Sequence, residues 1–210
     1  GSRGLGDVYK RQPYNNLVRF QEGESPGIFW GYVADGIFQN QSEVDSHATQ
    51  PNAQPGDIRF VDVNGDGVVN ADDRTKIGDP FSDFQIGWDF NLNVYNFDLS
   101  VRTYGTFGND IFRGYERNLN YTNKPVSILA RWTGEGTSNF EPRATFIDSN
   151  NNVRPSTRYV EDGSYFKIKN VQVGYNFNVS NSKSLDAVRL YLQGNNSVSY
   201  THLRAHETQL

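Results

Sequence analysis

Cysteine is the most informative absence from this sequence of 210 residues. Without cysteine, the chain can form no disulfide framework and carries no thiol nucleophile. This excludes the disulfide stapling used by small secreted domains, although it assigns no cellular compartment. Basic residues are in the minority, and the formal net charge is −4. The chain therefore has no basic footprint for nucleic acid, and we expect no nucleic-acid partner.

Long apolar runs are also missing. No stretch of about 18 consecutive apolar residues occurs, so we expect no membrane-spanning helix. Residues 1–12 also lack the apolar segment of a signal peptide. The chain is instead rich in glycine, with 20 residues, and in phenylalanine and tyrosine, with 14 and 12. Glycine favours turns and aromatic residues favour pleated strands, which indicates an all-β fold.

Histidine is scarce and occurs only at positions 47, 202 and 206. No Ser/His/Asp nucleophile set with a local signature can be assembled from these residues. The carboxylate pairs at 72–73 and 161–162 do not suit a glycosidase, because adjacent residues of a strand point to opposite faces. We therefore expect that the chain is not an enzyme.

The two ends of the chain, residues 1–12 and 198–210, resemble translated adaptor sequence. We interpret them as non-native or unrelated tails and exclude them from the fold prediction. The prediction therefore rests on residues 13–197.

An aspartate-rich loop, residues 62–73, has the spacing of a twelve-residue calcium loop. Oxygen-bearing side chains stand at its first, third, fifth, ninth and twelfth positions, and a glycine stands at the sixth. Calcium takes about six to eight oxygen ligands, and the glycine allows the turn that brings alternate residues inward. The predicted ligands are Asp62, Asn64, Asp66, the carbonyl of Val68, Asn70 and Asp73.

An ordinary Asn-Gly and Asp-Gly turn is the alternative interpretation of this loop. Its last position is Asp73 instead of the longer glutamate of a sensor loop, and no amphipathic helices flank it. The sequence therefore predicts a structural calcium site instead of a switch.

Strict alternation of apolar and polar residues predicts long strands. It runs over 84–94 and, after a tight turn at 95–96, over 97–102, which indicates an antiparallel hairpin. Two further strands are predicted at 170–177 and 188–193. Earlier in the chain, shorter elements are expected: a strand-like run at 26–38 and at most a short helix at 42–47, after which residues 58–61 lead into the aspartate-rich loop.

Two interpretations compete for the alternating strands: a soluble sandwich with an apolar core, and an outer-membrane barrel with an apolar face toward lipid. Membrane-spanning strands need about 9–11 residues, whereas globular strands centre on about five or six. The turns at 95–96 and 179–185 are short, whereas the connection over 107–164 is long. This alternation favours the barrel, with the long connection and the aspartate-rich loop outside the cell.

A set of ordered motifs carries a family resemblance. It comprises GDIRFVDVNGDG at 56–67, DDR at 72–74, IGDP at 77–80, FDLS at 97–100, GNDI at 108–111, RWT at 131–133 and STRYVEDGSYFKIKN at 156–170. These motifs resemble the C-terminal part of a SusC/RagA-type TonB-dependent outer-membrane transporter of Bacteroidota. The likeness covers nearly everything between the two tails, including the calcium-loop region at 56–80.

The resemblance implies an antiparallel transmembrane β-barrel segment, incomplete in this chain, with long extracellular loops. It also implies the outer membrane of a Gram-negative bacterium, contact with lipid, a SusD-like surface lipoprotein as partner and import of oligosaccharides or peptides. The N-terminal plug and the segment that contacts TonB are missing from this sequence. We therefore expect a fragment that supplies barrel strands and loops facing the substrate or the partner.

A soluble calcium-binding β module is the alternative function, either dockerin-like or adhesin-like. A dockerin carries two such loops, each followed by a helix, whereas this chain has one, followed by strands. Aromatic residues of the long connection could stack on sugars or dock the lipoprotein, or could pack within the loops. They are Tyr115, Tyr121, Trp132, Phe140, Phe146 and Tyr159.

Overall fold

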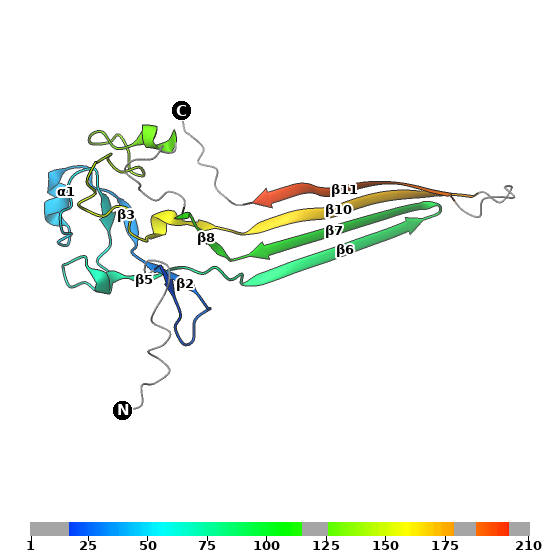
Figure 1. The fold of residues 1–210 in the computed structure, drawn as a ribbon, viewed down its shortest axis with the longest axis horizontal. Coiled ribbons are helices and arrows are strands. Elements are labelled where there is room, and N and C mark those ends of the chain that lie inside the picture. Colours follow the sequence, from blue (N-terminus) through cyan, green and yellow to red (C-terminus); the bar gives the residue numbers. More distant parts are fainter. Residues whose placement is uncertain (1–16, 115–125, 179–187, 202–210) are drawn as a thin grey trace, which may run out of the picture. The chain divides into compact units, whose positions relative to one another are not determined.

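The computed structural model describes residues 17–114, 126–178 and 188–201 and divides the chain into two compact units (Figure 1). The loop unit comprises residues 1–80 and 111–161, and the sheet unit comprises 81–110 and 162–210. Strands dominate both units, as the composition predicted. Within the described residues, no helix is long and apolar enough to cross a membrane. The predicted tail at 1–12 and the turn at 179–185 lie outside the described residues.

The sheet unit is one antiparallel sheet of four long strands in the order β11-β10-β7-β6 (Figure 1). The strands are β6 (Phe84–Val94), β7 (Phe97–Phe107), β10 (Tyr165–Phe177) and β11 (Val188–Thr201). The hairpin turns at 95–96, as predicted, and Tyr95 takes a positive φ of 52° there. β6 has the predicted bounds, whereas β7, β10 and β11 extend beyond theirs. The backbone of β11 pairs with β10 up to Thr201, inside the predicted tail at 198–210.

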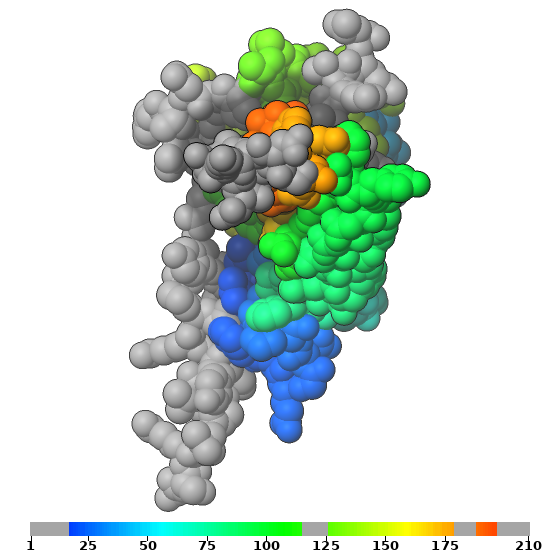
Figure 2. Space-filling model, turned by 90° about the vertical axis from the view of Figure 1, so that its right-hand side faces the viewer, coloured from blue at the N-terminus to red at the C-terminus, as the bar shows by residue number. Residues whose placement is uncertain are grey.

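Alternating residues of the four strands form one continuous apolar face. The register places Leu92 opposite Leu99, Leu99 opposite Val173, and Val173 opposite Leu192. Leu92, Val173 and Leu192 are 44%, 45% and 79% exposed. Figure 2 shows β6 and β7, in green, at the molecular surface. The buried two-layer interior of a soluble sandwich is therefore not found over this face in the described part of the chain.

A β-bulge keeps this face continuous along β10. Apolar residues stand at even positions up to Ile168 and at odd positions from Val171 onward. The register shifts between Ile168 and Asn170 against both neighbouring strands. Against β7, Lys169 is the extra residue, whereas against β11 the two residues 196 and 197 stand where β10 has Lys169 alone. An extra residue in one strand restores the alternation of faces, and Ile168 and Val171 therefore share the apolar face.

The loop unit is built from short elements. A three-stranded sheet joins β1 (Val18–Arg19), β2 (Ile28–Gly31) and β5 (Thr75–Gly78), and a two-stranded ladder joins β3 (Ala34–Ile37) and β4 (Ile58–Phe60). The predicted strand-like run at 26–38 is therefore two strands that belong to different sheets. The remaining elements are α1 (Gln41–Ser46), β8 (Asp110–Phe112), which pairs with β9 (Val160–Asp162), and the 3-10 turns η2 (Ala71–Asp73), η4 (Val126–Ala130) and η5 (Thr157–Tyr159).

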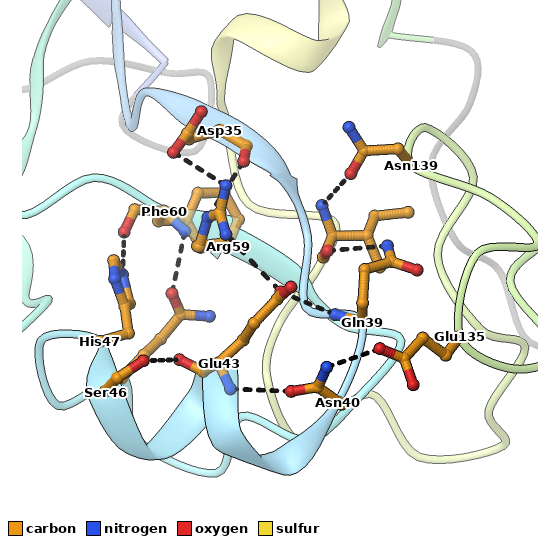
Figure 3. A network of polar contacts seen from close by, with 12 residues as sticks. Asp35, Gln39, Asn40, Glu43, Ser46, His47, Arg59, Phe60, Glu135 and Asn139 are labelled. Atoms are coloured by element: carbon orange, nitrogen blue, oxygen red, sulfur yellow. Dashed lines mark hydrogen bonds and ion pairs between the residues drawn. The ribbon is translucent and has the colours of Figure 1, made fainter.

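Polar contacts hold α1 against the long connection (Figure 3). The side chain of Asn40 caps the helix, because its Oδ1 accepts from the backbone N–H of Glu43 at 3.0 Å. Its Nδ2 donates to Glu135 at 2.8 Å. Arg59 of β4 pairs with Asp35 of β3 at 3.1 Å. The predicted helix at 42–47 is confirmed and starts one residue earlier.

Side-chain amides satisfy the outer edge of β4. The buried side chain of Asn152 accepts from the backbone N–H of Ile58 at 2.8 Å, and Asn150 donates to the Ile58 carbonyl at 3.2 Å. Gln50 accepts from the N–H of Phe60 at 2.9 Å and donates to the Ile58 carbonyl at 2.8 Å. Since unpaired buried backbone groups are costly, these amides replace a missing neighbouring strand.

The outer edge of β3 is satisfied in the same way. Thr157 accepts from the N–H of Ala34 at 2.9 Å, and Asn139 accepts from the N–H of Ile37 at 3.0 Å. Both acceptors belong to the long connection over 107–164. The connection is therefore packed on the β3–β4 ladder, and the aspartate-rich loop belongs to the same unit, as the loop alternation led us to expect.

Replacement of Asn152 with alanine tests this network. We expect Asn152→Ala to destabilise the loop unit by about 1–3 kcal/mol, because it leaves the buried N–H of Ile58 without an acceptor. Limited proteolysis of the full-length protein should then cut within 139–157 faster than in the unsubstituted protein. The control is the exposed neighbour Ser149→Ala. Equal cleavage rates for the two variants would contradict the assigned role of Asn152.

Candidate functional site

The aspartate-rich loop is folded around its own carboxylates. Asp62 accepts from the backbone N–H of Gly65 at 2.8 Å and from that of Gly67 at 2.7 Å. These glycines have φ values of 74° and 84°, in the left-handed region that favours glycine. The turn expected from the sequence is therefore present, and Asp62 holds it closed.

Asn64 and Asp66 continue this pattern on the exposed side of the loop. Asn64 accepts from the N–H of Asp66 at 2.9 Å, and Asp66 accepts from the N–H of Val68 at 2.8 Å. The second oxygen of Asp66 accepts from the Asn64 amide at 3.0 Å. A carboxylate offers about four acceptor positions, so Asp62 and Asp66 each keep capacity for a cation.

Asp73 has a different environment, because it is fully buried. One of its oxygens accepts from the N–H groups of Val63 and Asn64 at 2.9 and 3.3 Å. The other accepts from the N–H of Asn70 at 2.7 Å and forms a capping box at η2. Asp73 thus ties the start of the loop to its end.

The hydrogen bonds of Asp73 decide its protonation. Burial acts to raise the pKa of this carboxyl, but the backbone N–H groups of Asn70, Asn64 and Val63 favour the charged form. The net effect is a pKa below the ordinary value of 3.8. The carboxylate therefore stabilises the fold above that ordinary value, and this stability is lost as the pH falls through the lowered pKa.

The loop fits a calcium ion in part. Within the residues that the structure describes, no group of three or more His, Asp or Glu side chains is arranged to hold a metal ion. The carboxylate, amide and carbonyl oxygens are nevertheless the ligands that calcium prefers. Asn64 and Asp66 are exposed and Asp62 is partly exposed, and all three fit this role, whereas buried Asp73 fits it least. The six ligands, which include the Val68 carbonyl and Asn70, stay a prediction.

The residues considered for catalysis have structural partners. The ring of His47 contacts the carbonyl of Phe60 through Nε2 at 2.8 Å (Figure 3). Glu161 pairs with Arg113 at 2.8 Å. The other two histidines, at 202 and 206, lie outside the described residues.

Of the four described loop aromatics, Trp132 and Tyr159 are packed, whereas Phe140 and Phe146 are exposed. Trp132 donates to Gln39 at 3.3 Å, and its ring lies so close to Gly56 that a Cβ there would be 2.4 Å away. Tyr159 is buried, and Phe140 lies beneath the guanidinium of Arg158 at 4.4 Å. Phe146 is 93% exposed. The remaining two, Tyr115 and Tyr121, lie outside the described residues.

The polar face of the sheet carries charged residues that the sequence analysis did not single out. Arg102 pairs with Asp89 at 2.7 Å, and Arg189 pairs with Asp98. Tyr104, Tyr165, Lys167 and Lys169 form a further cluster, described below, which we name the lysine–tyrosine cluster. Alternation places Tyr104 on this face, but the strand register is needed to bring residues so distant in sequence together.

Replacement of Asp73 with asparagine separates its charge from its shape. Asp73→Asn should destabilise the loop by about 1–3 kcal/mol near neutral pH, because the amide group that replaces one oxygen cannot accept from a backbone N–H. The measurement is cleavage of the full-length protein within 60–75 as a function of pH. The difference from the unsubstituted protein should shrink as the pH falls below the ordinary carboxyl pKa of 3.8 and through the lowered pKa of Asp73. A difference that is constant with pH would rule out the charge effect.

No protein-family model matches the chain. The chain is 33% identical over 193 residues to TonB-dependent receptor P3 of Formosa agariphila, and the alignment covers 86% of the chain and 18% of that receptor. It is 25% identical over 148 residues to TonB-dependent receptor SusC of Bacteroides thetaiotaomicron, and this alignment covers 70% of the chain and 14% of SusC. These relatives do not favour a soluble calcium-binding module.

Solved structures show the same fold. A chain of the RagAB peptide transporter aligns with a TM-score of 0.66 at 16% identity, over 91% of this chain and 21% of that chain. A chain of the RagAB peptide importer in the closed-closed state aligns with a TM-score of 0.64. The predicted fold, an incomplete antiparallel β-barrel segment with long loops, is confirmed. The chain, which spans less than a quarter of the length of these relatives, belongs to the SusC/RagA type of TonB-dependent receptors.

Proposed function

We propose that these residues form part of the wall and the outer loops of an outer-membrane importer. In this proposal β6, β7, β10 and β11 cross the membrane, with the apolar face toward lipid and the polar face toward the pore. The strands have 11, 11, 13 and 14 residues, and a tilted barrel strand needs about 9–11 to span a bilayer.

The observation that carries this proposal is the contrast between the two faces of the sheet. The apolar face exposes large side chains, among them Trp88 and Phe97, each 57% exposed. The other face carries amides and ion pairs. An exposed apolar face of this size requires a cover, and acyl chains supply one without a second layer of protein.

Import of oligosaccharides or peptides with a SusD-like lipoprotein is the activity we propose for the whole receptor. Support comes from the family resemblance and from RagAB, which is described as a peptide importer. Energy from TonB would enter through parts of the receptor outside this sequence. The names of the relatives describe receptors and transporters, which is consistent with a chain that is not an enzyme.

The loop unit would face the substrate or the partner. Its ladder edges and the ion pair between buried Asp57 and partly exposed Arg143, 2.8 Å apart, give it a fixed shape. We propose that calcium bound at the aspartate-rich loop stiffens one side of this unit, because coordination would neutralise the carboxylates of Asp62 and Asp66.

A charge on the apolar face tests the barrel orientation. We expect Val101→Arg to reduce folding into the outer membrane, because arginine facing lipid near the bilayer centre costs about 2–4 kcal/mol. The control is Ser100→Arg, one residue earlier and on the polar face. The folded fraction of the full-length receptor is measured by heat-modifiable migration in gels. If both variants fold equally well, the face assigned to lipid is wrong.

Removal of one predicted ligand tests the calcium proposal. In the full-length receptor, Asp66→Ala should weaken calcium binding by about tenfold or more in calorimetry, because it removes a charged ligand. It should also increase cleavage within 60–75 when calcium is present. Asp72→Ala removes the same charge from an exposed residue outside the ligand set and serves as control. Absence of calcium binding in the unsubstituted receptor would remove the proposal.

A further inference from the structure

The lysine–tyrosine cluster lies on the polar face of the sheet. Tyr104 of β7 stands opposite Lys167 of β10 in the register, and the rings of Tyr104 and Tyr165 have centroids 6.2 Å apart. The ammonium group of Lys169 lies 4.4 Å from the centroid of Tyr104, and that of Lys167 lies 5.2 Å from the centroid of Tyr165. The bulge at Lys169 therefore brings a second cation into this cluster.

Tyrosine rings, and not carboxylates, hold these two lysines in place. The acidic residues of the four strands are Asp89 and Asp98, and each is paired with an arginine. Among the described residues, neither Lys167 nor Lys169 takes part in an ion pair. A cation over an aromatic ring keeps its full charge, since the ring supplies only a quadrupole. The cluster thus presents two uncompensated positive charges, in a chain whose net charge is −4.

The space beside the cluster is open. Residue 87 lies opposite Tyr104 on β6 and is a glycine, and a Cβ placed there would have no atom of the described residues within 4 Å. The hydroxyl of Tyr104 donates to Gln85 at 3.0 Å, which fixes the ring. Lys169 is exposed, and Lys167 is partly exposed. A ligand in front of the sheet can therefore reach both ammonium groups.

We infer that the lysine–tyrosine cluster binds acidic groups of the imported substrate, and that the substrate is an acidic oligosaccharide. The inference rests on the proposed function, in which this face lines the pore. The two lysines would pair with a sugar carboxylate or sulfate, and the neighbouring amides would bind its hydroxyl groups.

An oligosaccharide suits this face better than an acidic peptide does. Peptides are commonly recognised through a free strand edge or through apolar pockets for their side chains. The cluster lies on β7 and β10, whose backbone groups pair on both sides within the sheet. Its polar neighbours include the amides of Gln85, which accepts from the Tyr104 hydroxyl, and Asn170, which follows Lys169, in place of apolar pockets.

Calorimetry on the full-length receptor in detergent at low ionic strength tests this inference. The probes are trigalacturonate, which carries carboxylates, and maltotriose, which is a neutral sugar of the same length. Trigalacturonate should bind more tightly. The double variant Lys167→Gln with Lys169→Gln should weaken trigalacturonate binding by about tenfold, since exposed ion pairs contribute modestly each. It should leave maltotriose binding unchanged.

The charge-conserving variant Lys167→Arg with Lys169→Arg is the matched control and should retain trigalacturonate binding. Equal binding of the two sugars, or no binding of either, overturns the inference, as does a glutamine variant that binds like the original. Triglutamate binding as tightly as trigalacturonate would overturn the choice of a sugar. The Val101→Arg test is independent of these probes: normal barrel insertion without a preference for the acidic sugar would reject this inference alone.

Discussion

The constraint on which the loop unit depends is the need to pair the backbone of a buried three-residue strand. Ile58 of β4 is buried and has a neighbouring strand on one side only. The connection that follows the first hairpin supplies Asn150 and Asn152 on the other side, about ninety residues further along the chain. A buried backbone group left without a hydrogen-bond partner destabilises the fold by as much as several apolar contacts stabilise it. The hydrogen bonds that complete β4 therefore also hold the connection against this strand. This reciprocal need explains how a connection with few regular elements acquires a defined structure.

The sheet unit solves the same problem differently, and the difference supports its proposed function. Its inner strands, β7 and β10, pair on both sides, so their side chains need not serve the backbone. One set of alternating side chains is free to be apolar, and the other can carry charges such as the pair of Arg102 and Asp89. A sheet whose two faces differ so completely is suited to separate lipid from a water-filled pore. Binding groups can then be placed on the pore side without a cost to the strands.

Residue alternation was sufficient to predict the long hairpin, because period two in a sequence maps directly onto the faces of a strand. It was less informative for β10, where the change of parity between Ile168 and Val171 made the predicted strand begin at 170 instead of 165. The same change is the signature of the bulge. The amide network on β4 left no comparable signal: Gln50, Asn150 and Asn152 lie in polar stretches that are usually exposed, and a single sequence does not tell which amides are buried. A single sequence also does not tell which residues of distant strands stand opposite each other, so the lysine–tyrosine cluster became apparent only from the strand register.

The aspartate-rich loop shows that one sequence pattern can serve two physical purposes. The spacing that predicts calcium ligands also predicts side chains that cap the backbone of a tight turn, and Asp62 and Asp73 both do so. In the structure, backbone N–H groups close the turn on Asp62 and Asp73. The three donors of buried Asp73 stabilise its charged form. The charges of Asp62 and Asp66 are not paired with a basic side chain in the ion pairs of the described residues. In our proposal calcium binds these two carboxylates and rigidifies the turn.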